Sequence, residues 1–231
     1  MELKIISEDK YILCIDKPQG IPSQSDKTND EDLMTICSEY LKSKGESPYL
    51  GLIQRLDRPV GGVIVFAKTE FANKELSKQV QNRQINKEYF AVVCGKPHKE
   101  VEILEDYLKK LKTINMSKIT DANDKLAKLA KLEYTDVKTV ETEEYGALTL
   151  LKIKLYTGRH HQIRLQLSNA GMPIWGDNKY NKIFVKKKEF TQIALWSHKF
   201  GFTHPKFKKY VEFESNPKNI YPFKLFEEFK Q

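Results

Sequence analysis

Residues 54–67 read QRLDRPVGGVIVFA, and the interpretation of the whole chain starts from this stretch. Residues 62–67 form a short apolar run that is typical of a buried strand. A proline and two glycines follow Asp57, and these turn residues can expose its side chain. Arg55 and Arg58 flank the aspartate. The stretch therefore predicts a carboxylate that is presented among guanidinium groups just before a buried strand.

Arginine is rare in this chain, which has 34 Lys and 5 Arg. Besides the two arginines beside Asp57, two more lie in residues 158–164, which read GRHHQIR, and only Arg83 lies elsewhere. Arginine offers a planar, permanently charged fork that pairs with carboxylate or phosphate at two points and stacks on flat rings. Its concentration in two segments indicates that these segments carry the chemistry, and an aspartate among arginines in a basic protein suggests acid chemistry on a nucleic acid.

The composition predicts a soluble globular protein with a polyanionic partner. The chain has 231 residues, of which 40% are hydrophobic and 30% charged, with a net charge of +8. This length fits one large domain or two small ones, and we expect a single domain over residues 1–231. The charge favours nucleic acid ahead of a membrane surface, with a solvated lysine-rich surface as the alternative.

The cysteines and the N-terminus predict a cytoplasmic protein. Cys14, Cys37 and Cys94 are odd in number, show no CxxC spacing, and are expected to be reduced. The N-terminal residues lack the pattern of a signal peptide, and no apolar run approaches the length of a membrane span. The five histidines form no ligand pattern and no phosphate-binding glycine loop is present, so neither a metal nor another cofactor is expected.

Strands and helices are expected to alternate irregularly, which predicts an α+β fold with a mixed, mostly antiparallel sheet flanked by helices. The expected strands cover residues 11–15, 62–67, 88–94, 148–156, 192–202 and 208–213. The expected helices begin at Asn29 with an acidic first turn, after Thr69, at His161 and at Pro222. Residues 100–124 are charged without a clear period, and irregular or mobile structure is expected there.

Taken one at a time, the candidate residues have ordinary interpretations. An isolated Asp57 is most simply a turn aspartate. Tyr89 is most simply a core residue of a strand, although it could stack on a base. Arg164 could belong to a solvated helix face. These residues indicate a functional site only when they are considered together.

Read together, five ordered blocks resemble the RluA-type pseudouridine synthases, which isomerise uridine in ribosomal or transfer RNA. The blocks are residues 12–20 (ILCIDKPQG), residues 55–57 (RLD), residues 87–89 (KEY), residues 157–164 (TGRHHQIR) with residues 171–177 (GMPIWGD) and Tyr180, and residues 194–205. The resemblance covers nearly the whole chain. It implies the pseudouridine synthase fold and a catalytic domain without the extra RNA-binding module that precedes it in many members.

The resemblance also implies the roles of the catalytic residues. Asp57 would be the nucleophile in a reaction that detaches uracil from ribose, rotates it and rejoins it through carbon 5, without a cofactor. Arg164 would pair with Asp57 and orient its carboxylate. Tyr89 would stack on the flipped base and assist proton transfer, because a base must leave the RNA stack before it can react.

The RNA is the expected partner, either ribosomal or transfer RNA, and a monomer with no obligatory protein partner is expected. Arg55 would fill the gap left in the RNA stack, and Arg159 would hold phosphates. The other residues assigned to substrate binding are Arg58, His161, Gln162, Leu195 and Lys17.

Two departures from the family pattern bear on how the substrate is positioned. The family has His where this chain has Gln54, and Thr-Ser-Gly where residues 60–62 read VGG. One alternative is a non-catalytic RNA-binding protein on the same scaffold, and another is a hydrolase that uses Asp57 with a histidine. The target uridine stays open, as does the atom that Asp57 attacks, which is either a ribose carbon or carbon 6 of uracil.

Overall fold

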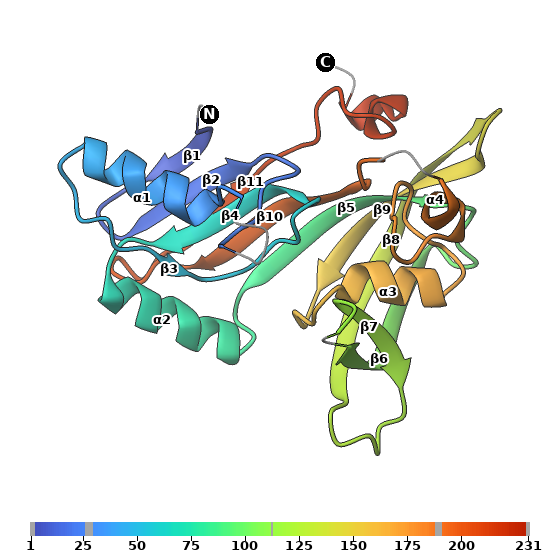
Figure 1. Cartoon of the computed structure of the whole chain (residues 1–231), viewed down its shortest axis with the longest axis horizontal. Helices are drawn as coiled ribbons and strands as arrows, with labels where there is room; N and C mark the ends of the chain where they lie inside the picture. Colours follow the sequence, from blue (N-terminus) through green and yellow to red (C-terminus); the bar gives the residue numbers. More distant parts are fainter. Residues whose placement is uncertain (1–2, 26–29, 112, 188–190, 230–231) are drawn as a thin grey trace. The chain divides into compact units, whose positions relative to one another are not determined.

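The apolar run after Asp57 forms strand β4 (Gly61–Ala67), in which every residue is buried, in a computed structural model of the chain. The structure describes residues 3–25, 30–111, 113–187 and 191–229. It divides into two compact units (Figure 1). The first unit comprises Met1–Lys87 and Ser197–Asn216, and the second comprises Glu88–Trp196 and Pro217–Gln231. Each unit is therefore built from two separate segments of the chain.

Strands outnumber helices among the described residues. The other strands are β1 (Ile5–Glu8), β2 (Ile12–Lys17), β3 (Gly51–Leu52), β5 (Asn86–Cys94), β6 (Val101–Leu111), β7 (Met116–Thr120), β8 (Lys128–Thr142), β9 (Gly146–Leu155), β10 (Leu195–Thr203) and β11 (Tyr210–Glu214). The helices are α1 (Leu33–Ser43), α2 (Glu70–Gln81), α3 (Gln162–Asn169), α4 (Lys182–Lys186) and two short 3-10 helices, Phe223–Leu225 and Glu227–Phe229.

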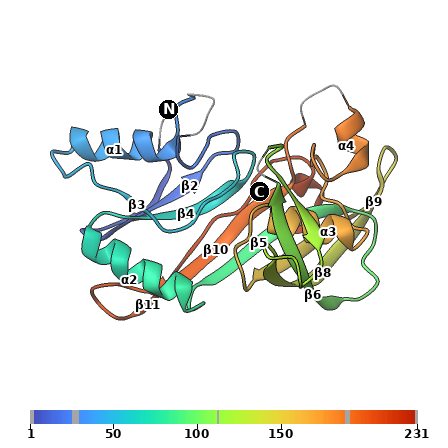
Figure 2. The ribbon, with the colours of Figure 1, turned by 60° about the horizontal axis from the view of Figure 1, so that its bottom comes forward.

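The first unit is a sheet with a helix on each face. Its strands follow the order β1-β2-β4-β10, with β3 also paired to β4 and β11 to β10. Helices α1 and α2 lie on opposite faces of this sheet (Figures 1 and 2). Ala72 and Leu76 of α2 pack against Val63 and Val65 of β4 and against Phe200 of β10. The side chains alternate along β4, so both of its faces contribute to a core.

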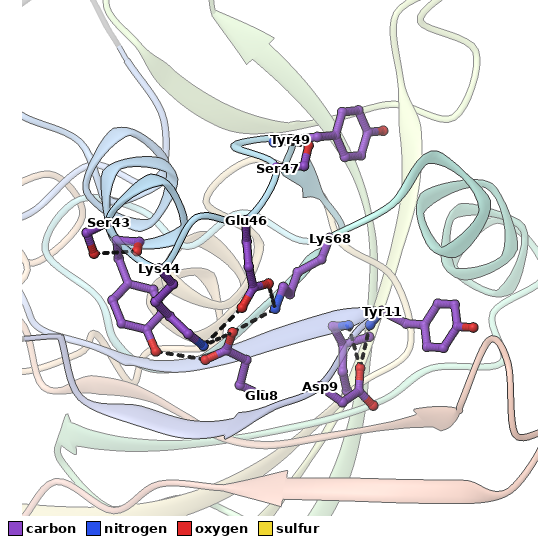
Figure 3. A network of polar contacts seen from close by, with 11 residues as sticks. Glu8, Asp9, Tyr11, Ser43, Lys44, Glu46, Ser47, Tyr49 and Lys68 are labelled. Carbon is purple, nitrogen blue, oxygen red and sulfur yellow. Dashed lines mark hydrogen bonds and ion pairs between the residues drawn. The ribbon is translucent and has the colours of Figure 1, made fainter.

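A network of charged side chains joins β1, α1 and the end of β4 (Figure 3). The carboxylate of Glu8 lies 2.8 Å from the ammonium of Lys44 and 2.6 Å from that of Lys68. Glu46 pairs with the same two lysines, at 3.1 and 2.6 Å. Tyr40 donates its hydroxyl to Glu8 at 2.8 Å. Burial acts to raise the pKa of Glu8, but the hydrogen bonds from Lys44, Lys68 and Tyr40 outweigh burial and lower this pKa to about 2.

The second unit is an antiparallel sheet with strand order β5-β9-β8-β6-β7. Strands β8 and β9 form its long central hairpin. Helix α3 lies beside β6 and β7 (Figures 1 and 2), where Leu165 packs against Leu108 and Ala130. Near the C-terminus, the ring of Phe229 meets that of Phe90 on β5, with ring centres 5.1 Å apart.

The observed fold confirms the α+β prediction and corrects two of its elements. Helix α1 begins at Leu33, and its cap is Asp32, whose carboxylate accepts the backbone N–H of Thr35. Asn29, which was expected to be the cap, lies outside the described residues. Residues 100–124 contain strands β6 and β7, so the expectation of irregular structure was wrong. The single domain over residues 1–231 stays a prediction.

Candidate active site

Asp57 lies in a tight loop between β3 and β4 in the first unit. The loop closes when the backbone N–H of Val60 donates to the carbonyl of Asp57 at 2.9 Å. Asp57 is half-buried, and β4 begins directly after the loop. Gly62 has a φ of +109°, and a Cβ atom at this position would overlap the backbone carbonyl oxygen of Ser197. The glycine therefore allows the chain to leave the loop and enter the buried strand.

The backbone of this loop is held by the last residue of β2 and by the turn that follows this strand. The ammonium of Lys17 donates to three carbonyls, those of Pro18 at 3.0 Å, Arg58 at 3.3 Å and Val60 at 2.7 Å. The N–H of Gly20 also donates to the carbonyl of Arg58, at 2.9 Å. An ammonium has three donors, and here each has an acceptor. Lys17 and Gly20 thus fix the loop on the C-terminal side of Asp57.

This arrangement changes the role that the sequence suggested for Lys17. Its side chain is completely buried, so it cannot reach a phosphate from its position in the fold. Burial lowers the pKa of Lys17 to about 7, with the nearby Asp57 carboxylate acting to raise it and Arg58 to lower it. We therefore interpret Lys17 as a residue that positions the Asp57 loop, and no longer as one that binds substrate.

Ser23 fixes the loop on the N-terminal side of Asp57. Its hydroxyl donates to the carbonyl of Leu56 at 2.8 Å and accepts the N–H of the same residue at 3.1 Å. Both residues are buried. Ser23 could not be predicted from the sequence, because no motif marks this serine and its partner is 33 positions away. Together with Lys17, Ser23 fixes the backbone on both sides of the aspartate.

The two arginines of the loop differ in their surroundings. Arg58 donates its Nε to the carbonyl of Gly20 at 3.0 Å and pairs with Asp30. Arg55 is exposed to solvent. Of the two, Arg55 is the more open to solvent, whereas Arg58 ties the loop to the turn after β2.

Gln54, which stands where the family has His, has a structural role in this chain. Its amide donates to the carbonyl of Val63 at 2.8 Å, and the hydroxyl of Ser197 donates to the same carbonyl at 3.0 Å. The side chain is therefore engaged with β4. This departure from the family pattern supports the strand that follows the loop.

The other candidate residues lie in the second unit. Tyr89 is buried on β5, where it pairs with Ile153 of β9. Leu195 is buried at the start of β10. Arg159 is half-buried, and its Nε donates to the carbonyl of Leu129 at 2.9 Å.

The segment before α3 is organised by Gln162. Its side-chain oxygen accepts the hydroxyl of Thr157 at 2.8 Å and the N–H of Arg159 at 3.0 Å, and its amide donates to Gln166 at 2.9 Å. The residue is 3% exposed. Because its hydrogen-bonding groups are used internally, Gln162 is better described as a support for Arg159 than as a residue that binds substrate.

Arg164 forms a buried two-point pair with Asp177. Its Nε donates to one carboxylate oxygen at 2.8 Å and its terminal nitrogen to the other at 2.6 Å. Arg164 is 3% exposed and Asp177 is fully buried. Asp177 belongs to the block of residues 171–177, but nothing in that block predicted its pairing with Arg164. The expected pairing of Arg164 with Asp57 stays a prediction, since the two residues belong to different units.

His161 is a buried, uncharged histidine at the start of α3. It has a φ of +53°, and its Nδ1 lies 2.9 Å from the hydroxyl of Tyr180. Burial, then the charge of Arg164, then that of His160 lower its pKa to about 2. His161 therefore positions the α3 motif in its neutral form and is not a cationic phosphate ligand.

Among the described residues, no three His, Cys, Asp or Glu side chains gather as a metal site. In the same part of the chain, no helix is both long enough and apolar enough to cross a membrane.

The sequence model of the family described as RNA pseudouridylate synthase matches residues 11–169, which include the Asp57 loop and the α3 motif. The chain belongs to this family. It is an RNA pseudouridine synthase, as the sequence motifs predicted, and the family membership favours the enzyme over a non-catalytic RNA-binding protein.

Several relatives of this synthase span most of its length. An uncharacterized RNA pseudouridine synthase of Bacillus subtilis (strain 168) is 30% identical over 220 residues, which are 93% of this chain and 69% of the relative. The ribosomal large subunit pseudouridine synthase C of Rickettsia bellii (strain RML369-C) is 34% identical over 176 residues, and the match covers 76% of this chain and 56% of the relative. The tRNA pseudouridine synthase C of Vibrio vulnificus (strain CMCP6) is 27% identical over 248 residues, and the match covers 99% of this chain and 96% of the relative.

Solved structures support the fold of the synthase. Human RNA pseudouridylate synthase domain containing 1 superimposes with a TM-score of 0.75 at 17% identity, covering 93% of this chain and 83% of that chain. At this identity the likeness supports the fold alone.

Proposed function

We propose that this synthase uses Asp57 as the nucleophile that converts uridine to pseudouridine in ribosomal or transfer RNA. The observation that carries the proposal is the fixed backbone around Asp57. Hydrogen bonds hold Leu56 on one side and Arg58 and Val60 on the other, while the Asp57 side chain is left half-buried. A nucleophile that is held in place loses less freedom when it meets its substrate, which lowers the barrier to reaction.

The proposed reaction leaves the atom count of the nucleotide unchanged. The bond from N1 of uracil to C1′ of ribose breaks, and a bond from C5 to C1′ forms. C5 gives up its proton and N1 gains one. Asp57 supplies the electron pair for a transient covalent bond, either to C1′ or to C6 of uracil, and recovers it at the end.

Tyr89 and Arg164 are proposed as further catalytic residues on the strength of their motifs. Tyr89 would stack on the flipped uracil and assist the proton transfer at C5. Arg164 would orient the reacting carboxylate, and its pairing with Asp177 supports this role because it fixes the guanidinium plane. Arg55 would fill the gap that the flipped base leaves in the RNA stack, and Arg159 would hold phosphates.

The experiment compares the wild-type protein with Asp57→Asn on RNA that contains 5-fluorouridine. Fluorine replaces the hydrogen that must leave C5, so the wild type should give a rearranged fluorinated nucleoside or a protein–RNA adduct. Asp57→Asn should give neither, while Asp121→Asn, which changes an exposed aspartate, should behave as wild type. Unaltered fluorouridine with the wild type, on unmodified ribosomal and transfer RNA, would instead identify a binding protein. Turnover by pure Asp57→Asn would refute the role of Asp57.

We also propose that the synthase acts in the cytoplasm as a monomer without a cofactor. Light scattering should give a mass near the 26.9 kDa of one chain. Treatment with a chelator should leave the activity unchanged. Comparing pseudouridine maps of RNA from cells with and without the protein would identify the target uridine.

A further inference from the structure

The hairpin of β6 and β7 in the second unit is firmly attached to the α3 motif. The backbone N–H of Ser117 on β7 donates to the hydroxyl of Tyr180 at 2.7 Å, and the Ser117 hydroxyl donates to the carbonyl of His160 at 2.8 Å. The ammonium of Lys179 donates to the carbonyl of Asn115 at 2.8 Å. Because these bonds join the turn and the start of β7 to His160, Lys179 and Tyr180, the hairpin and the motif should move as one body.

His160 lies at the centre of this attachment, because both its backbone and its ring meet the hairpin. Its carbonyl accepts the hydroxyl of Ser117, and its ring Nδ1 lies 2.9 Å from the same hydroxyl. The ring Nε2 lies 3.0 Å from the side-chain oxygen of Asn115.

One further cation, Lys110, lies on the same side of the hairpin. Leu108 packs against α3, and Lys110 is two positions further along β6, so its side chain leaves the same face of the strand. Lys110 is also the cross-strand partner of Ser117, which bonds to His160. Lys110 is exposed, and among the described residues no ion pair includes it. Lys110 and Lys179 thus form a cationic face beside the α3 motif.

We propose that this cationic face binds phosphates of the RNA that flank the target uridine. The inference rests on the proposed function for the choice of RNA as partner. Phosphate contacts supply most of the affinity for nucleic acid, and a rigid cationic element next to the α3 motif would fix the register of the RNA. Lys110 contacts the phosphate directly, Lys179 adds charge, and the bonds of Lys179 and His160 to the hairpin keep it in place.

The hairpin offers a matched control on its other face. Lys118 on β7 is exposed like Lys110 and has no ion pair among the described residues, but its neighbour Ser117 points toward His160, so Lys118 points away from the α3 motif. Lys110→Gln and Lys118→Gln remove the same charge from the same hairpin. Neither change touches a buried contact, so both variants should fold.

The test measures RNA affinity against salt concentration in the Asp57→Asn background, with unmodified transcripts of large-subunit ribosomal RNA and of transfer RNA as probes. Loss of one phosphate contact should lower the slope of log affinity against log salt by about 0.7–0.9, which corresponds to roughly five- to eight-fold weaker binding at 0.1 M salt. Lys110→Gln should show this loss and Lys118→Gln should not. Equal effects of the two variants, or none, would overturn the proposal. The comparison stays valid even if Asp57→Asn turns out to be active, so failure of the proposed function would be recognised separately.

Discussion

Replacing Ser23 by alanine should destabilise the synthase and loosen its catalytic loop. The substitution removes the hydroxyl that both donates to and accepts from the buried backbone of Leu56. Each buried polar group that loses its partner costs about 1–3 kcal/mol. With two such groups, and some relaxation of the loop toward water, we expect the free energy of unfolding to fall by about 2–4 kcal/mol. Urea denaturation followed by circular dichroism measures this change.

A second measurement links the loss to catalysis. The rate of a single turnover at saturating RNA should fall in Ser23→Ala, because Asp57 follows Leu56 directly and loses its fixed position. Ser23→Thr retains the hydroxyl and should restore most of the rate. Ser38→Ala removes a hydroxyl that bonds to the exposed carbonyl of Pro48, and its stability should change by less than about 0.5 kcal/mol. If Ser23→Ala were as stable and as fast as the wild type, the argument that Ser23 holds the loop would be wrong.

Three further predictions concern buried or paired groups. Asp177→Ala leaves the Arg164 guanidinium buried without its carboxylate, and urea denaturation should show a loss of about 3–5 kcal/mol. Gly62→Ala should prevent soluble expression or lower the melting temperature sharply, because the new methyl group meets the Ser197 carbonyl; an unchanged melting temperature would refute the close approach. The fold lowers the pKa of Glu8 from 4.5 to about 2. The ionised carboxylate therefore contributes its full stabilisation above pH 4.5, and this contribution is lost as the pH falls toward 2. In Glu8→Gln, the free energy of unfolding should depend less on pH between 4.5 and 2 than in the wild type.

Local signals in the sequence were enough to predict much of the first unit. Thr69 was expected to cap a helix, and its side chain accepts the N–H of Ala72 at the start of α2. The strand after the Asp57 loop was expected from its apolar run, and β4 is buried along its whole length. These features depend on residues that are neighbours in the chain, so a single stretch of sequence contains the information.

Features that depend on distant partners were harder to predict. Strand β6 was missed because its charges obscure the alternation typical of a strand, yet Glu105 pairs with Lys131 on β8, at 3.3 Å. Asp106 accepts from Gln166 of α3 at 2.8 Å. The internal role of Gln162 was hidden for a related reason, since a glutamine in a motif looks the same whether it faces RNA or other residues of the chain.

The way in which the catalytic loop is held determines which of its residues can be substituted. Lys17 holds the loop through carbonyl oxygens, which every amino acid possesses, so its hydrogen bond to residue 60 does not depend on the side chain there. The Val60 side chain is buried, so its replacement must fit the same space. This explains how valine and glycine can stand at residues 60 and 61 where the family has threonine and serine. The shape of the loop is thus encoded mainly by the end of β2 and the turn that follows it. A library of substitutions should accept threonine as well as valine at the buried position 60 and very few residues at position 17.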